Sequence, residues 1–505
     1  MKRTLQRTIA AEKRKIERRL GDAVRVNAGG PVLAAPTIRY ELAAKTKAIA
    51  AGGMGAIHRL VQATGLAARI DAAVTLFKIH QPYHESDHVL NIAYNILCGG
   101  HTLDDIERRR NDRVFLDALG TASLPDPTTA GDFCRRFDAD RIDALMDAIN
   151  ETRLAVWQRC PGLTEQTARI DGDGTLVPTT GACKEGMDIA YTGLWGYHPL
   201  VVSLANTGEP LFLKNRSGNR PSHEGVIPYF EKAIALCRRA GFRDILLRGD
   251  TDFALTTAFD RWTDAGVRFV FGYDATRTMV QWGQTAPPEL YTALVRRTER
   301  ALTTRPRHRP ARVKDRRVRE RGFRKITTVR EEVVDFAYQP TACTRSYRVV
   351  ALKKNLSVEK GEHVLFDDIR YFFYITNDST LSCSEVVQEA RQRCDQENLI
   401  AQLKGGVRAL HAPVNTLHAN WAYMVMASLA WSLKAWVALS LPIAPRWRAR
   451  HTEEQRRLLR MDFRTFLGAF VNVPCQILTS GRRVIFRLLA WNPWQYVFFR
   501  FVATT

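Results

Sequence analysis

The chain has 505 residues, which is too long for one ordinary hydrophobic core. It is also strongly basic, with a formal net charge of +22. Hydrophobic residues make up 45% and charged residues 25% of it, which excludes a disordered chain. Nine cysteines occur singly, which excludes a disulfide scaffold and a zinc finger and favours a reducing compartment. The charge indicates a polyanionic partner, with nucleic acid first and an anionic membrane second.

Neither the first 20 residues nor the most apolar segment of the chain favours a membrane protein. The first 20 residues are basic and lack the apolar core of a secretory signal. The best candidate span is 419–442, but Lys434 interrupts it, and the uncharged run before Lys434 is shorter than the roughly 20 residues that a span needs. We expect a buried helix at 419–442. For the whole chain, we expect a bacterial, cytoplasmic protein associated with the nucleoid.

The first third of the chain has a helical pattern. After a basic arm at 1–45, apolar residues recur at three and four up to about residue 164, and several short helices carry arginines. Such a module is typical of a helical DNA-binding region, although a solvated helix face gives the same pattern.

The pattern changes to strands at about residue 165. Three consecutive strands are expected, then a helix that ends at Gly241, then a strand, a helix and another strand. This order predicts an α/β fold with a mixed sheet and helices on its faces. The expected strands lie at 168–177, 198–206, 210–218, 244–250 and 267–274.

A basic, β-rich stretch at 276–368 interrupts this alternation of strands and helices. Its cations are better explained by a path for a DNA backbone than by a linker. The cations expected to contact phosphates are Arg305, Arg307, Arg309, Arg312, Lys314, Arg316 and Arg317. The expected organisation is an arm (1–45), a helical DNA-binding region (46–164), a first catalytic part (165–275), a β-rich insertion subdomain (276–368), a second catalytic part (369–440) and a C-terminal helical region for dimerisation (441–505).

Carboxylates at strand positions suggest a site. Asp171 and Asp173 alternate on the first expected strand, so both point to one face, where like charges repel unless the face is solvated or a positive group lies between them. Asp250 ends the strand at 244–250, at the sheet edge where α/β proteins bind ligands. Alone, Asp250 is equally explained as a cap of the next helix.

A long helix expected at 384–406 adds a third acid. Arg393, Glu397 and Lys404 share one face of it, because offsets of four and eleven residues return to nearly the same direction. A surface ladder of salt bridges is the usual explanation of such spacing. Ile400 and Leu403 share much of that side, which indicates that the face is not fully solvated.

Together, Asp173, Asp250 and Glu397 suggest one metal site. Carboxylates without His or Cys partners suit Mg²⁺, with Mn²⁺ as the alternative, and two such ions promote phosphoryl transfer. Arg393 and Lys404 would then hold phosphate oxygens. Asp171 is either an acid that orients this site from behind or a solvated strand neighbour.

The acid motifs resemble those of a DDE-type insertion-sequence transposase, an RNase H-like enzyme, from the branch with an inserted β domain. The Asp-Gly-Thr that begins at Asp173 fits the family's Asp-x-Thr, and residues 248–253 fit its Arg-x-Asp-Ser/Thr-x-Phe. Segments at 83–107 and 478–489 also resemble this branch, so the likeness covers most of the chain.

The third motif resembles the branch's Tyr-x2-Arg-x3-Glu-x6-Lys signature. Arg393, Glu397 and Lys404 have that spacing, whereas the tyrosine position holds Ala390. The role that the tyrosine has at DNA ends in this branch is therefore not expected of residue 390 in this chain.

The resemblance implies a transposase that cleaves the ends of its element and joins the freed 3′-hydroxyls to target DNA. It implies Asp173, Asp250 and Glu397 as catalytic ligands of two Mg²⁺ ions. Double-stranded DNA, as terminal inverted repeats and target, would be its partner, and a homodimer would synapse two ends.

Two other classes stay open. One is a metal-dependent RNase H-like nuclease that cleaves but does not join strands. The other is a DNA-binding relic without catalysis, against which the intact set of acids speaks. A two-carboxylate glycosidase is a distant further alternative, because the charge of +22 would have no role in it.

Overall fold

The computed structural model describes most of the chain. The described residues are 3–26, 40, 46–79, 82–160, 162–181, 183–294, 321, 324–360, 363–481, 483–489 and 491–504. The basic tract at 305–317 lies outside the described residues, so its expected contacts with DNA stay a prediction.

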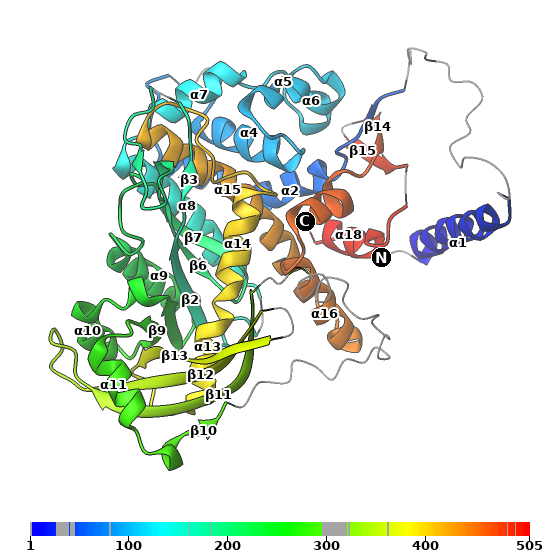
Figure 1. Ribbon diagram of the computed structural model, residues 1–505. Helices are drawn as coiled ribbons and strands as arrows, with labels where there is room; N and C mark the ends of the chain where they lie inside the picture. Colours follow the sequence, from blue (N-terminus) through cyan, green and yellow to red (C-terminus); the bar gives the residue numbers. More distant parts are fainter. Residues whose placement is uncertain are drawn as a thin grey trace.

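One sheet organises the centre of the molecule (Figure 1). Five of its strands are β2 (Ala168–Gly174), β6 (Leu200–Leu204), β7 (Glu209–Lys214), β8 (Ile245–Gly249) and β9 (Arg268–Tyr273). They lie in the order β9-β8-β2-β6-β7, with β2, β6 and β7 antiparallel in turn and with β8 and β9 parallel to β2. A meander of three strands followed by two strands parallel to the first is the RNase H-like order, which confirms the expected α/β fold.

The two faces of β2 are covered by different helices. On one face, α9 (Val226–Ala240) brings Phe230 against Gly172, where an added Cβ would lie 2.7 Å from its ring. The other face carries Arg169, Asp171 and Asp173, and it is covered by α13 (Cys383–Gln392) and α14 (Cys394–Lys404). Arg169 and Asp173 of β2 are therefore bonded to residues of this helix pair, through Glu389 and Arg393.

The long helix expected at 384–406 is interrupted. The α-helical hydrogen-bond pattern breaks at Arg393, and the amide of Gln396 donates to the Arg393 carbonyl at 2.8 Å, a tighter turn than an α-helix makes. Neither Gly nor Pro marks this break in the sequence.

The β-rich insertion extends the central sheet. Its strands β10 (Thr292–Ala293), β11 (Arg324–Tyr338), β12 (Tyr347–Lys360) and β13 (His363–Thr376) continue the sheet from β9 outward, and β13 pairs antiparallel with β9. The expected boundary at 368 falls inside β13, because one unbroken strand joins the insertion to the expected strand at 370–377. The strands of the insertion are thus built onto the edge of β9 and share the central sheet.

Helices from both ends of the chain pack around α15 (Leu417–Leu439), which contacts α4, α7 and α8. Of the described residues, only α15 forms a helix long and apolar enough to cross a membrane, and its residues 419–439 are all buried inside the protein. The expected buried helix is confirmed. The N-terminal helices are α2 (Met54–Thr64), α3 (Leu66–Ala73), α4 (Glu85–Leu97), α5 (Glu107–Arg110), α6 (Arg113–Leu119), α7 (Pro127–Arg135) and α8 (Ala139–Trp157).

The C-terminal region is only partly helical, so the expected all-helical ending is wrong. After α16 (Arg448–Leu459) and α17 (Phe463–Phe466), the hairpin β14 (Cys475–Ser480) and β15 (Arg483–Leu488) precedes α18 (Gln495–Val502). Gly481 has φ +57° in the turn, and β1 (Ala48–Ile49) adds a third strand. The basic helix α1 (Arg3–Val26) lies beside α18, set off from the main body (Figure 1).

Candidate active site

The parallel register of β2 and β8 brings the first two expected acids together. Asp171 pairs with Arg248, and the same register two residues further along puts Asp173 level with Asp250. Asp250 directly follows β8, and its carboxylate accepts a hydrogen bond from the Asp252 amide at 3.0 Å. Asp250 therefore does cap the short turn after β8, as well as lying beside Asp173.

Arg393 joins the third acid to the first. Its guanidinium donates to Oδ2 of Asp173 at 3.1 Å and lies 3.5 Å from Oε1 of Glu397, one turn further along α14. The Asp173 side chain is 14% exposed and that of Glu397 is 60% exposed. The expected helix face therefore does reach the strand acids, with Arg393 between them.

Burial and like charges shift the ionisation of the strand acids. Burial raises the pKa of Asp173 to about 6; Arg393 opposes this shift, and the negative charges of Asp250 and Glu397 add to it. Burial also raises the pKa of Asp250, again against the pull of Arg393. Burial is the largest cause of both shifts, so each of these acids accepts a proton more readily than a solvated carboxylate does.

The remaining residues of the signature helix hold this arrangement in place. Gln396 is buried, and its side-chain amide donates to the Val201 carbonyl of β6 at 3.0 Å, which fixes α14 on the sheet. Lys404, at the end of α14, lies near enough to feel the charge of Asp173, while burial lowers the pKa of Lys404. Ile400 and Leu403 are buried as expected.

Asp171 has a different environment from Asp173. It is fully buried, and its two oxygens accept from Arg248 at 2.7 and 2.8 Å, so it is not a solvated neighbour. Arg248 also donates to Glu389 on α13 at 3.2 Å, and Arg169 donates to Glu389 at 2.8 and 2.9 Å. This buried network ties β2 and β8 to α13.

Two histidines beside the acids were not expected from the sequence. The Nδ1 atom of His198 lies 2.7 Å from the Arg220 carbonyl, and its Nε2 lies 3.0 Å from the place that a Cβ on Gly174 would take. The charge of His223 lowers the pKa of Asp250, and its buried Nδ1 has no hydrogen-bond partner among the described residues. A lone histidine gives no spacing pattern, so the sequence held no signal for either.

The acids fit a divalent metal by their chemistry. No group of three or more His, Cys, Asp and Glu side chains in the described part of the chain is close enough to hold an ion. The donors are nevertheless carboxylates only, the set that Mg²⁺ prefers, and their charge is partly offset by Arg393. Glu397 is exposed, so its carboxylate is accessible to an ion from solvent.

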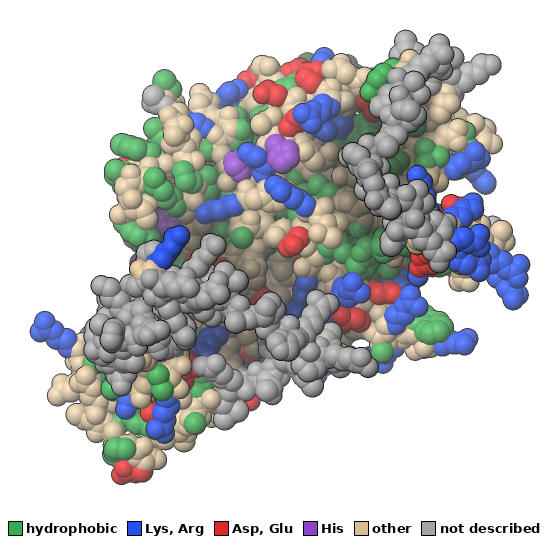
Figure 2. Space-filling view, turned by 45° about the vertical axis from the view of Figure 1, so that its right-hand side comes forward, with side chains coloured by type: hydrophobic (Ala, Val, Ile, Leu, Met, Phe, Trp, Pro, Cys, Tyr) green, Lys and Arg blue, Asp and Glu red, His purple; other side chains and the backbone are tan. Residues whose placement is uncertain are grey.

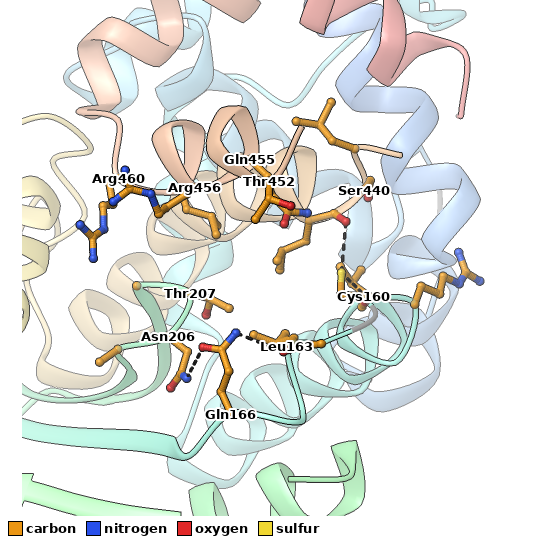
Figure 3. Close-up of a pocket in the computed structure, with 18 of the residues that line it drawn as sticks. Cys160, Leu163, Gln166, Asn206, Thr207, Ser440, Thr452, Gln455, Arg456 and Arg460 are labelled. Atoms are coloured by element: carbon orange, nitrogen blue, oxygen red, sulfur yellow. Dashed lines mark hydrogen bonds between the residues drawn. The ribbon is translucent and has the colours of Figure 1, made fainter. Parts of the chain in front are cut away.

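A large cavity lies on the other side of α14. It has a volume of about 1600 Å³, and Figure 3 shows Gln166, Asn206 and Thr207 on one wall facing Thr452, Gln455, Arg456 and Arg460 on the other. None of the three acids lines this cavity, although Asp395, Asn398 and Gln402 of α14 do. Glu397 is exposed to solvent, whereas the Asp173 side chain is mostly buried.

An RNase H-like sheet with acids at the ends of two neighbouring parallel strands and on the covering helix defines an enzyme of the polynucleotide phosphoryl-transfer class. The sequence matches the family described as transposase DDE domain group 1 over residues 42–504, and the chain belongs to that family. It is a DNA transposase of the DDE type, a class that acts on DNA and uses divalent metal ions.

Other comparisons add little. No curated protein matches the sequence. A solved structure titled as the piggyBac transposase synaptic complex with hairpin DNA is 8% identical, with a TM-score of 0.33 over 84% of this chain and 81% of that chain. A superposition this loose places no residue of this chain.

Proposed function

We propose that this transposase cuts at the ends of its element and joins the freed 3′-hydroxyls to target DNA, with Asp173, Asp250 and Glu397 holding two Mg²⁺ ions. Bound there, the ions would supply an activated attacking oxygen and stabilise the leaving oxygen. The observation that carries the proposal is that Arg393 pairs with Asp173 of β2 at 3.1 Å and lies 3.5 Å from Glu397 of α14, while its charge also acts on Asp250 at the end of β8.

The chain's own side chains would position the DNA. Arg393, which pairs with Asp173 and lies close to Glu397, would hold a scissile phosphate, for which its planar fork is suited. Lys404, close to Asp173, offers a second positive charge for the same phosphate. Asp171, held by Arg248, would keep the two strands in the register on which the acids depend.

Regions outside the catalytic sheet would bind the rest of the DNA. We assign the terminal repeats to the helical region at 46–164, and further backbone contacts to the tract at 305–317. Lys and Arg side chains lie around the central hollow of the face in Figure 2 and gather at its right-hand edge. Two protomers would synapse two ends through their C-terminal regions, acting in the bacterial cytoplasm on the nucleoid.

The test is a cleavage and joining assay with the DNA that flanks the gene. Purified protein is incubated with a labelled fragment that carries one inverted-repeat end and with supercoiled target, in Mg²⁺ or EDTA. We expect Mg²⁺-dependent nicks at the end and joined product, both lost in Glu397→Gln. Nicks without joined product would instead establish the nuclease, and specific binding without nicks the relic.

A matched control lies two residues away. Asp395 is an exposed acid on the same helix, but it lines the cavity on the far side of α14. Asp395→Asn removes the same charge as a change at the site and should leave cleavage within about twofold of the wild type. Equal loss in Glu397→Gln and Asp395→Asn would refute the assignment of Glu397.

A further inference from the structure

Gln396 is a buried amide directly before Glu397 in α14. Its side chain is 1% exposed, and both ends of its amide are hydrogen-bonded to β6. The Nε2 group donates to the Val201 carbonyl at 3.0 Å, and Oε1 accepts from the hydroxyl of Ser203, which is also 1% exposed. Gln396 is the one buried polar side chain of α14, whose other buried side chains are Leu399, Ile400 and Leu403.

Both bonds of Gln396 end on β6 opposite an aspartate of β2. In the antiparallel register of these strands, Val201 is the partner of Asp173, and Ser203 is the partner of Asp171. The amide before the third acid is therefore attached to the strand position across from the first acid.

The attachment to Asp173 passes through a single peptide group. The Thr175 amide donates to the Pro199 carbonyl at 3.0 Å, and hydrogen-bonded pairs recur at every second position of an antiparallel ladder. Asp173 and Val201 are the next such pair along the ladder. The Val201 carbonyl thus faces the Asp173 backbone amide as well as the side chain of Gln396.

The apolar contacts of α14 do not set its exact position on the sheet. Hydrophobic packing has no preferred direction, so it tolerates a helix that slides or turns. A slip of one residue moves a side chain by about 1.5 Å along the helix axis and by about 100° around it. Hydrogen bonds weaken steeply with distance and angle, so the two bonds of Gln396 fix both the axial position and the rotation of α14.

The break at Arg393 gives α14 a need for its own attachment. On one side of the break, α13 is held to the sheet by Glu389, which accepts from Arg169 and Arg248. Because the α-helical pattern is interrupted at Arg393, this attachment does not extend through a continuous helix into α14. Gln396 lies three residues beyond the break and supplies the attachment there.

We propose that Gln396 is a positioning residue, which holds Glu397 at the distance from Asp173 that a divalent ion requires. This inference rests on the proposed function, in which both acids hold the ions. Mg²⁺ accepts only near-ideal octahedral geometry with oxygens at about 2 Å, so a carboxylate displaced by about 1 Å no longer serves it well. Gln396 acts only through Glu397.

The experiment replaces Gln396 by a side chain of similar length that forms no such bonds. In Gln396→Met, binding of Mn²⁺ to the protein without DNA should weaken by about 10-fold, measured from the electron paramagnetic resonance signal of the free ion. End cleavage should slow by about 100-fold in Mg²⁺ and by less in Mn²⁺. Ser203→Ala removes one of the two bonds from the strand side, so it should weaken Mn²⁺ binding in smaller measure, by about threefold.

A matched control lies in the same helix. The side chain of Gln402 donates to Asp462 at 2.9 Å and accepts from the Phe463 amide at 3.0 Å, so it makes the same kind of bonds to a segment outside the catalytic sheet. Gln402→Met should leave Mn²⁺ binding and cleavage within about twofold of the wild type. Circular dichroism establishes that each variant is folded at the assay temperature. Equal weakening in both methionine variants, or unchanged Mn²⁺ binding in Gln396→Met, would overturn the proposal. If Gln396→Met does not fold, unchanged Mn²⁺ binding in Ser203→Ala would overturn it.

A double variant tests whether Gln396 acts through Glu397. Gln396→Met combined with Glu397→Gln should bind Mn²⁺ no more weakly than Glu397→Gln alone, because the group that Gln396 positions is already lost. Losses that multiply would contradict the proposed role.

The wild type separates this inference from the proposed function. A wild type that neither binds Mn²⁺ nor cleaves DNA would refute the proposed function and this inference with it. A wild type that does both, beside a Gln396→Met protein that does both equally well, would refute the inference alone.

Discussion

Two acid–arginine clusters lie two residues apart on the same pair of strands, and they differ in almost every other respect. The inner cluster pairs Asp171 and Glu389 with Arg248 and Arg169, so its charges balance, and Asp171 and Arg248 are fully buried. The outer cluster is Asp173, Asp250 and Glu397 around Arg393, with more negative than positive charge. A closed and balanced network holds elements together, whereas an open and unbalanced one has capacity for a ligand.

The largest expected difference between the clusters is in catalysis. Asp173→Asn, Asp250→Asn or Glu397→Gln should each lower the rate of end cleavage by at least about a thousandfold, because each removes one of the acids that we propose as ligands of the catalytic ions. Binding of the paired element end, measured by gel shift, should change little. A folded Asp250→Asn protein that cleaves at near wild-type rate would contradict the assignment of catalysis to the outer cluster.

Stability should respond in the opposite way. Asp171→Asn leaves Arg248 buried without its bidentate partner and should lower the free energy of unfolding by about 3–5 kcal/mol. Asp173→Asn, in the outer cluster, should lower it little or raise it. Thermal unfolding followed by circular dichroism checks both, and an equal loss in the two variants would contradict the distinction.

The clusters should also differ in the sign of their pH dependence. In metal-free protein the pKa of Asp173 is raised to about 6, above its value in the unfolded chain of about 3.9. Between these values the folded state binds more protons, so the free energy of unfolding should fall by about 2–3 kcal/mol from pH 4 to pH 6. Asp173→Asn should remove this decline.

In the inner cluster the sign is reversed. Although burial opposes it, Arg169 and Arg248 lower the pKa of Glu389, so this contribution is present at neutral pH and is lost as the solution becomes acidic. Denaturant titrations in EDTA at pH 4 to 7 measure the two trends. A wild type whose stability only rises over that range would contradict the raised pKa of Asp173.

The smallest expected effect is that of metal on the folded protein without DNA. Mg²⁺ at ten times its dissociation constant should stabilise the wild type by about 1.4 kcal/mol, because it binds the folded state alone. The melting temperature should rise by about 1–3 °C. Asp173→Asn should lose this rise and Asp395→Asn should keep it, and a rise that survives in both would place the metal elsewhere.

The sequence predicted the part of this site that periodicity and strand order determine. The alternation of Asp171 and Asp173, and the position of Asp250 at a strand end, were readable because each depends on one element. Glu397 and Arg393 were placed by helical spacing, and that face does meet the strands.

The features of the fold and of the site that were not predicted depend on contacts between elements. Arg248 as the partner of Asp171 follows from the parallel register, although the equal spacing of the Asp-x-Asp on β2 and the Arg-x-Asp at β8 was an available signal. The break at Arg393 has no Gly or Pro to mark it. The hairpin at 475–488 is marked by Gly481 and by neighbouring β-branched residues, but the aromatic, apolar composition of this region predicts helix instead.

The insertion has a consequence for how the enzyme can be altered. Because β13 is hydrogen-bonded directly to β9, and β9 to β8, the insertion is connected in series to the strand that ends at Asp250. It cannot be trimmed like a loop, since its removal would uncover the backbone edge of β9 and invite strand exchange between molecules. A ligand bound by the insertion is therefore held at a fixed distance from Asp250, because continuous backbone hydrogen bonds connect the two.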